Sequence, residues 1–150
     1  MSRECGTCSM CCKLPLIHEP SIAKPAHKWC RHCDVGKGCG IYEVRPKVCQ
    51  DFACIWLLRE EMPDDMRPDK CGAMFTTPLN DDAIHCTVDL NRRQVYRSGR
   101  VKEWLDKFAK RLVVKVIGEQ LPNSDESRVL YLAGPKHLVE KHLPEGMKSK

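Results

Sequence analysis

The uneven distribution of cysteine most strongly constrains what this chain can fold into. Residues 5–54 hold nine of the eleven cysteines, whereas residues 55–150 hold only Cys71 and Cys86. The same N-terminal stretch contains few large aliphatic residues, so its own hydrophobic core would be thin. Small cysteine-rich units of this kind are usually stabilised by disulfides or by bound metal.

Two observations favour metal over disulfides. The chain begins without an apolar run of signal-peptide length, and no stretch is apolar enough to span a membrane. Nine cysteines would also leave one thiol unpaired. We therefore expect a cytoplasmic protein with no membrane partner. In that compartment a high density of cysteine indicates metal binding or catalysis.

The first four cysteines form a cluster with the pattern C-x2-C-x2-C-C: Cys5, Cys8, Cys11 and Cys12. On a helix their sulfurs would fall within an arc of roughly 120°. In a loop, the same spacing would let consecutive thiolates surround one ion. Adjacent side chains rarely serve one tetrahedral site, so the pair Cys11 and Cys12 suggests two metals close together or a bridging thiolate.

The other five cysteines of residues 5–54 lie in and before a glycine-rich segment and in a predicted helix. They are Cys30, Cys33, Cys39, Cys49 and Cys54. Gly36, Gly38 and Gly40 surround Cys39 and permit turns with positive φ. Pro46 suits the first turn of a helix, which would carry the last two cysteines.

Apolar residues on either side predict how this stretch is covered. Three prolines in residues 13–29 exclude a continuous helix and predict an extended connector around the cysteines. Its apolar residues would form a small cover: Leu14, Leu16, Ile17 and Trp29. We expect the helix to run from Pro46 to about Glu61. Its buried face would hold Val48, Phe52, Ile55 and Trp56.

The two groups of cysteines form one longer pattern. The C-x2-C-x2-C-C cluster is followed by Cys39-Gly-Ile-Tyr-Glu-Val-Arg45-Pro46-x-x-Cys49-x-x-Phe-x-Cys54. This combination resembles the CxxCxxCC cysteine-cluster family, which is described as a zinc- or iron-chelating domain and includes flagellin lysine N-methylases. The resemblance covers about residues 5–56. The methylases are much longer proteins, so it does not extend to their activity.

The resemblance implies metal chelation at the matching cysteines, and Cys30 lies beside the pattern. The complete set of predicted metal ligands is Cys5, Cys8, Cys11, Cys12, Cys30, Cys33, Cys39, Cys49 and Cys54. Three histidines lie in the same stretch and stay open as ligands, because the sulfurs suffice without them: His18, His27 and His32. Cys71 also stays open, whereas Cys86 is expected to be a buried thiol.

The rest of the chain predicts a small folded unit that packs against the cysteine-rich stretch. We place a metal-binding lobe at residues 1–62 and a support unit at 63–150, packed as one domain. Strands are predicted at residues 73–77, 83–90 and 94–96 as an antiparallel meander, and at 128–133. Helices are predicted from Ser98 or Gly99 to about Gly118 and over residues 134–143.

The predicted fold class is therefore α+β. A metal-stapled N-terminal lobe with little regular structure and one helix would pack on a small antiparallel sheet with a covering helix. Arg45 lies beside the predicted helix start, where its guanidinium would offset the negative charge of a thiolate cluster. The alternative is that Arg45 is an ordinary surface arginine.

We expect a metal-chelating protein with a multinuclear thiolate centre, holding about two to three zinc ions, with iron or an iron–sulfur cluster as the alternative. Closed all-thiolate sites are usually structural, and no phosphate loop, serine-nucleophile elbow or His-Glu-x-x-His motif marks a catalytic residue. Whether the chain is an enzyme stays open. A second hypothesis is an iron–sulfur redox or methyl-transfer accessory protein, and a third is a zinc-stapled module that binds nucleic acid or protein.

The charge does not favour a nucleic-acid partner. The formal net charge of +5 counts thiols as neutral. Nine bound thiolates would remove nine charges and two zinc ions would return four, which brings the net charge to zero. The arginines around Tyr96 are the only candidate patch: Arg92, Arg93, Arg97 and Arg100. A partner protein is compatible with the sequence but not identified by it.

Overall fold

A computed structural model describes residues 8–35, 37–78 and 81–143 and has the predicted α+β fold. The helices are α1 (Lys47–Asp51), α2 (Ile55–Leu58), α3 (Pro68–Cys71), α4 (Gly99–Ala109) and α5 (Lys136–Val139). The strands are β1 (Cys33–Asp34), β2 (Gly38–Cys39), β3 (Ala73–Thr76), β4 (Ile84–Val88), β5 (Val114–Gln120) and β6 (Ser127–Ala133). Short 3-10 helices cover Met10–Cys12, Tyr42–Val44, Asp64–Met66, Leu90–Arg92, Val95–Arg97 and Glu140–His142.

The central sheet has four strands in the order β3-β4-β5-β6. The pair β3 and β4 is antiparallel, as is the pair β5 and β6, but β4 and β5 run parallel, with α4 as the crossover between them. The sheet is therefore mixed, and the prediction of an antiparallel meander was wrong for this connection. Two parallel strands cannot be joined by a tight turn, so the intervening helix is a topological requirement.

Alternation of side chains explains how the sheet forms its core. On β4, Ile84, Cys86 and Val88 are buried, whereas the residues between them are half-buried. Helix α4 covers this face, and the rings of Phe108 and Phe75 lie 5.4 Å apart. The predicted strands at residues 73–77, 83–90 and 128–133 are confirmed as β3, β4 and β6.

Helix α4 ends nine residues earlier than predicted. The expected helix to Gly118 stops at Ala109, and residues 114–120 form β5 instead. The run from Val113 to Ile117 is rich in β-branched residues, which favour strands once they pair with a neighbour on each side. Leu112, which falls within the predicted helix, is exposed in the turn between the two elements.

The strand predicted at residues 94–96 is also wrong. This segment contains the 3-10 helix Val95–Arg97, which follows a first one at Leu90–Arg92. Asp89 caps the first of these, since its carboxylate accepts a hydrogen bond from the amide of Asn91. The predicted C-terminal helix over residues 134–143 is present as α5 followed by the 3-10 helix Glu140–His142.

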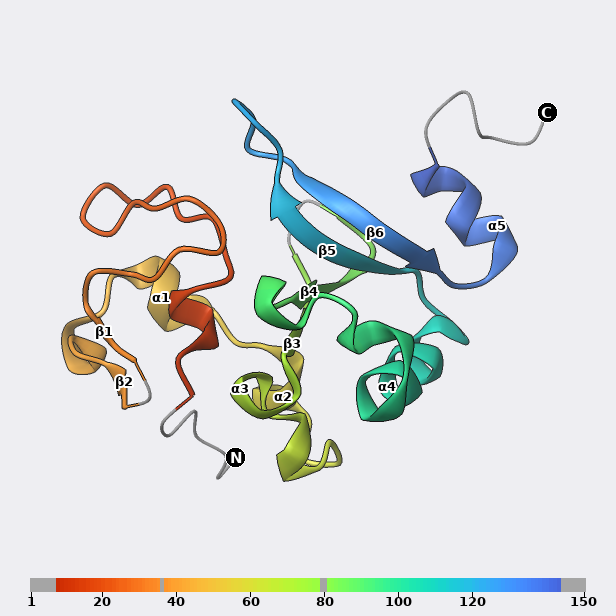
Figure 1. Cartoon of the computed structure of the whole chain (residues 1–150), viewed down its shortest axis with the longest axis horizontal. Helices are drawn as coiled ribbons and strands as arrows, with labels where there is room; N and C mark the ends of the chain where they lie inside the picture. Colours follow the sequence, from red (N-terminus) through yellow and green to blue (C-terminus); the bar gives the residue numbers. More distant parts are fainter. Residues whose placement is uncertain (1–7, 36, 79–80, 144–150) are drawn as a thin grey trace.

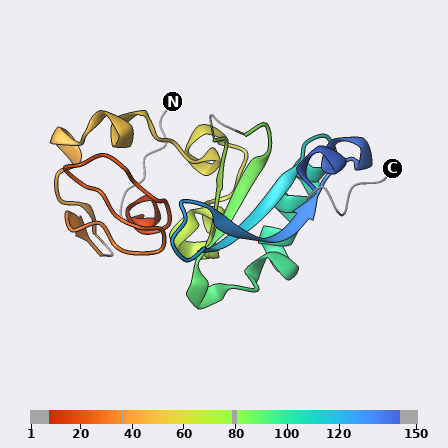
Figure 2. The ribbon, with the colours of Figure 1, turned by 90° about the horizontal axis from the view of Figure 1, so that it is seen from above.

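The cysteine-rich lobe, described over residues 8–54, lies beside the sheet and opposite to α5, as the two views in Figures 1 and 2 show. It shares the hydrophobic core of the sheet through Met10 and Leu14. Polar contacts also join the two parts, since the amide of Ala26 donates to the side-chain oxygen of Gln120 at 2.8 Å. The proposed boundary at residue 62 stays a prediction.

Within the described ranges, none of the helices combines the length and apolar character that crossing a membrane requires.

Candidate metal centre

A cavity of about 160 Å³ lies in the cysteine-rich lobe. Six of the nine predicted ligands line it: Cys8, Cys11, Cys12, Cys30, Cys39 and Cys49. They come from four separate segments of the chain, so only the folded lobe brings them together. Apolar side chains form the rest of the wall, mainly Leu16, Ile17, Ile22, Ile41, Val48 and Phe52.

A 3-10 turn positions the first of these cysteines. Residues Met10–Cys12 form this turn, and Met10 is buried in the core shared with the sheet. The anchored methionine leaves the neighbouring Cys11 and Cys12 at the cavity wall. A tight turn replaces the α-helical arc that was one of the two predicted arrangements. Cys5 lies outside the described residues.

The connector that follows carries part of the predicted cover. Leu16 and Ile17 line the cavity as expected, but Leu14 is buried in the main core and Trp29 is exposed. The connector folds back on itself through a β-bridge between Ile17 and Lys24. The amide of Cys30 then donates to the carbonyl of Cys12 at 2.7 Å, which places Cys30 beside the first cysteines.

The hairpin of β1 and β2 positions two further cysteines, because Cys33 and Cys39 face each other in its register. Gly38 has φ of 118°, a conformation that side chains disfavour. Gly40 approaches the carbonyl of His32 so closely that an added Cβ would lie 2.8 Å from its oxygen. The prediction for Gly36 falls outside the described residues.

The helix predicted from Pro46 to Glu61 is broken in two. Phe52 and Cys54 have extended backbone conformations between α1 and α2. On one continuous helix Cys49 and Cys54 would point about 140° apart. Ile55 and Trp56 are buried as predicted, whereas Val48 is exposed over 49% of its surface beside the cavity.

The thiols interact with one another. The thiol of Cys12 is hydrogen-bonded with both Cys11 and Cys33. The bond from Cys12 lowers the pKa of Cys11 and raises that of Cys12. Burial raises the pKa of Cys8 to about 12 and also raises the pKa of Cys54, although Cys54 does not line the cavity. A metal ion that binds at Cys8 or Cys54 would have to displace a proton that burial stabilises.

Arg45 also lines the cavity. Its guanidinium lies 3.9 Å from the centre of the Tyr42 ring and donates to the carbonyl of Tyr42 at 2.8 Å. A longer bond of 3.3 Å reaches the carbonyl of Cys49, and the positive charge helps to lower the pKa of Cys11. Its position fits the predicted role of offsetting thiolate charge.

The donor set is chemically suited to soft metal ions, but the sulfurs are not gathered around a single point. Among residues 8–35, 37–78 and 81–143, no three cysteine sulfurs lie within 4.8 Å of one another. The sulfurs instead surround a cavity several times larger than the ~30 Å³ that one water molecule occupies in the liquid.

The remaining candidates lie away from the cavity wall. Cys71 is buried, and its thiol donates to the carbonyl of Ala73 at 3.2 Å. Cys86 is fully buried in the sheet, as predicted. His18 is exposed beside Asp125, whereas the Nε2–H of His27 donates to the carbonyl of Gly118 in β5 at 2.6 Å. The ring of His32 is not part of the cavity wall.

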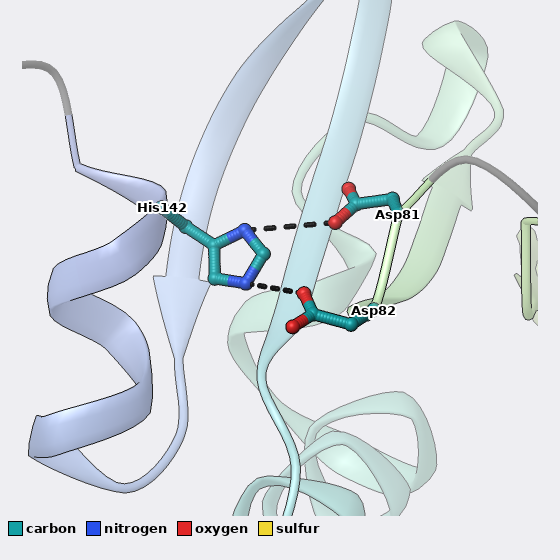
Figure 3. Close-up of side chains that lie close together, drawn as sticks. All are labelled: Asp81, Asp82 and His142. Carbon is teal, nitrogen blue, oxygen red and sulfur yellow. Dashed lines mark ion pairs between the residues drawn. The ribbon is translucent and has the colours of Figure 1, made fainter.

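A second group of possible metal donors was not predicted. Asp81, Asp82 and His142 have donor atoms within 4.8 Å of one another, and Figure 3 shows the imidazole between the two carboxylates. Lys115 already pairs with Asp81 at 2.7 Å, as does His85 at 2.8 Å, so this group is an ion-pair cluster that ties the C-terminal helical segment to the sheet. The sequence shows the two aspartates, but not that residue 142 folds back onto them.

The arginines around Tyr96 are largely engaged within the protein. Arg93 pairs with Glu119 and Arg100 pairs with Asp65 at 3.2 Å. The guanidinium of Arg92 donates to the carbonyl of Lys70 at 2.7 Å. These contacts reduce the charge available for phosphate contacts.

Comparisons of the chain with protein families, with curated proteins and with solved structures found no match.

Proposed function

We propose that this protein chelates zinc or iron in a multinuclear thiolate centre formed by the nine cysteines of residues 5–54. The observation that carries the proposal is the cavity, on which six cysteines from four chain segments converge. Cys33 contributes through its contact with Cys12, and Cys54 is near enough for the charge of Cys11 to help raise its pKa. Thiolates are soft ligands that select zinc, copper(I) or iron–sulfur clusters over magnesium or calcium.

Two features support several ions rather than one. Cys11 and Cys12 are adjacent in sequence and hydrogen-bonded to each other, so one ion could use both only with strain. The cavity has more volume than a single ion needs. Bridging thiolates between two or three ions would use nine sulfurs efficiently, and the resemblance to the CxxCxxCC cysteine-cluster family agrees with such a centre.

The apolar wall favours a structural or metal-handling centre. The described cavity wall includes no carboxylate or histidine side chain that could act as a general base. Bound zinc would cross-link segments that otherwise share few apolar contacts. An iron–sulfur redox or methyl-transfer accessory is the alternative, since the same volume could hold a cluster.

Metal analysis combined with absorption spectroscopy on anaerobically purified protein tests the proposal. About two to three zinc ions per chain without visible absorption would support a zinc–thiolate centre. Iron with acid-labile sulfide and a brown colour would support the iron–sulfur alternative. A single metal ion per chain would exclude a multinuclear centre, and a chain that binds neither metal under reducing conditions would refute the proposal.

The double variant Cys39→Ser/Cys49→Ser provides the specific test, with Cys71→Ser as the matched control. The first removes two thiols from the cavity wall, whereas Cys71 is hydrogen-bonded within the main core. Only the double variant should lose metal. Equal metal content in both variants would show that the bound ions lie elsewhere.

A further inference from the structure

Lys24 is a buried cation next to the predicted metal ligands. Only 9% of its surface is exposed. Its ammonium donates to the carbonyl oxygens of Lys13 at 2.8 Å, Pro15 at 2.5 Å and Pro25 at 3.1 Å. An ammonium group has three N–H donors, so the proline-rich connector closes around a cation whose hydrogen bonds are complete.

The groups that offer Lys24 negative charge are thiols. Among the described residues, no carboxylate forms an ion pair with Lys24. The ammonium donates to the carbonyl of Lys13, which directly follows Cys12, and the amide of Cys30 donates to the carbonyl of Cys12, so both cysteines are held on backbone next to Lys24. Burial lowers the pKa of Lys24 to about 8, and the thiolate charges oppose this change. A buried ammonium is costly without an opposite charge nearby.

A purely structural role does not explain this charge. A neutral amide would supply only two of the three N–H donors that these carbonyls accept, and the carbonyls carry no net charge that would balance the ammonium. The backbone of the connector is also held independently, because Ile17 and Lys24 exchange two amide hydrogen bonds of 3.0 Å. The positive charge gains a counter-charge only when the neighbouring cysteines lose their protons, as they must when they bind metal.

We propose that Lys24 is the built-in counter-cation of the thiolate centre, which stabilises a metal–thiolate assembly that carries excess negative charge. This inference rests on the proposed function. Four thiolates around one divalent ion leave a net charge of −2, and sharing sulfurs between ions reduces this excess without removing it. Arg45 lies at the cavity wall, whereas Lys24 is buried and does not line the cavity.

Zinc binding to the reduced chain tests this role, measured by competition with a chromophoric chelator. Lys24→Gln keeps two N–H donors for the three carbonyls but removes the charge, and Lys24→Arg keeps the charge. Lys28→Gln is the matched control, because Lys28 is exposed four residues away. Loss of one nearby charge should weaken zinc binding by about tenfold or more in Lys24→Gln. Lys24→Arg should recover most of the affinity, and the control should match the wild type.

A structural role predicts a different pattern, in which Lys24→Gln lowers the urea midpoint of the zinc-free chain. We expect that midpoint to be unchanged or higher, because a neutral side chain avoids burying a charge. Wild-type affinity in Lys24→Gln would overturn the inference, as would equal losses in Lys24→Gln and Lys24→Arg. A wild-type chain that binds neither zinc nor iron would instead refute the proposed function itself.

Discussion

Lys13 donates a hydrogen bond of 2.9 Å from its ammonium to the carboxylate of Asp89, across 76 residues of sequence. The side chains are only 13% and 14% exposed. Lys13 directly follows Cys12, whereas Asp89 directly follows β4. This ion pair therefore connects the turn that carries the first predicted ligands to the central sheet.

Loss of this ion pair should destabilise the protein measurably. Asp89→Asn keeps the size of the side chain and the cap on Asn91 but leaves Lys13 without a counter-charge. We expect a loss of about 1–3 kcal/mol in the free energy of unfolding, measured by urea denaturation. Asp106→Asn is the control, because its pair with Lys102 is exposed and should contribute less than about 1 kcal/mol. Equal losses of unfolding free energy in the two variants would show that the Lys13–Asp89 pair contributes no more to stability than an exposed ion pair.

Metal removal should affect the two parts of the protein differently. A chelator should increase amide hydrogen exchange across residues 8–54, for example at the amide of Cys30, which donates to Cys12. Amides that pair β4 with β5 should stay protected, because their core does not depend on metal. Exchange in residues 8–54 that stays unchanged after complete metal removal would contradict a stabilising role for the metal.

Substitution of a cavity cysteine should lower metal content, whereas substitution of the buried cysteine in the sheet should lower stability. Cys39→Ser removes a thiol from the cavity wall and should lower metal content with little effect on the stability of the sheet. Cys86→Ala leaves a space in a fully buried position and should cost about 1–2 kcal/mol. Metal content per folded chain should not change in Cys86→Ala. Metal loss in that variant would place Cys86 at the centre.

The cluster around Asp81 should make stability depend on acid pH. Burial alone would raise the pKa of Asp81, but hydrogen bonds from Lys115 and His85 hold that pKa well below its usual range. A lowered folded-state pKa stabilises the protein above the unfolded-state value of about 3.9. This stabilisation is lost as the pH falls through that value toward the folded-state pKa.

Asp81→Asn should therefore lower the free energy of unfolding by about 1–3 kcal/mol at neutral pH. The difference from the wild type should shrink below about pH 4. Asp82→Asn is the control, because the neighbouring carboxylate is 75% exposed. Urea denaturation at a series of pH values measures both variants. A difference that does not depend on pH would show that the charge of Asp81 is not responsible.

Local sequence patterns correctly predicted the helix and the strand whose apolar residues repeat at a regular spacing along the chain. Alternating apolar residues located β4, and the helical spacing of Val101, Leu105 and Phe108 located α4. The α+β class followed from these patterns. The cysteine spacing marked one stretch as the candidate metal site, because a high density of cysteine favours metal binding where disulfides are not expected.

Contacts between distant residues decided the rest. Val116 continues the helical stripe of Val101, Leu105 and Phe108, but Val114 would lie on the opposite side of such a helix. The burial of both valines between β4 and β6 selects the strand. The break at Phe52–Cys54 becomes favourable only when Ile55 and Trp56 enter the core of the sheet. Short-range periodicity contains no information about which segments meet, because partner, direction and burial are properties of the whole chain.

Lys13 and Lys24, the two lysines near the cysteines, show the same difference between what the sequence determines and what the tertiary structure determines. The sequence by itself determined that thiols gather in residues 5–54, and it predicted that they bind metal. Only the tertiary structure brought Lys13 to Asp89 and enclosed Lys24 among three carbonyls beside the thiols. The physical reason is that the cost of a buried charge depends on the partners that the fold supplies, and those partners are distant or are backbone atoms that no sequence pattern marks.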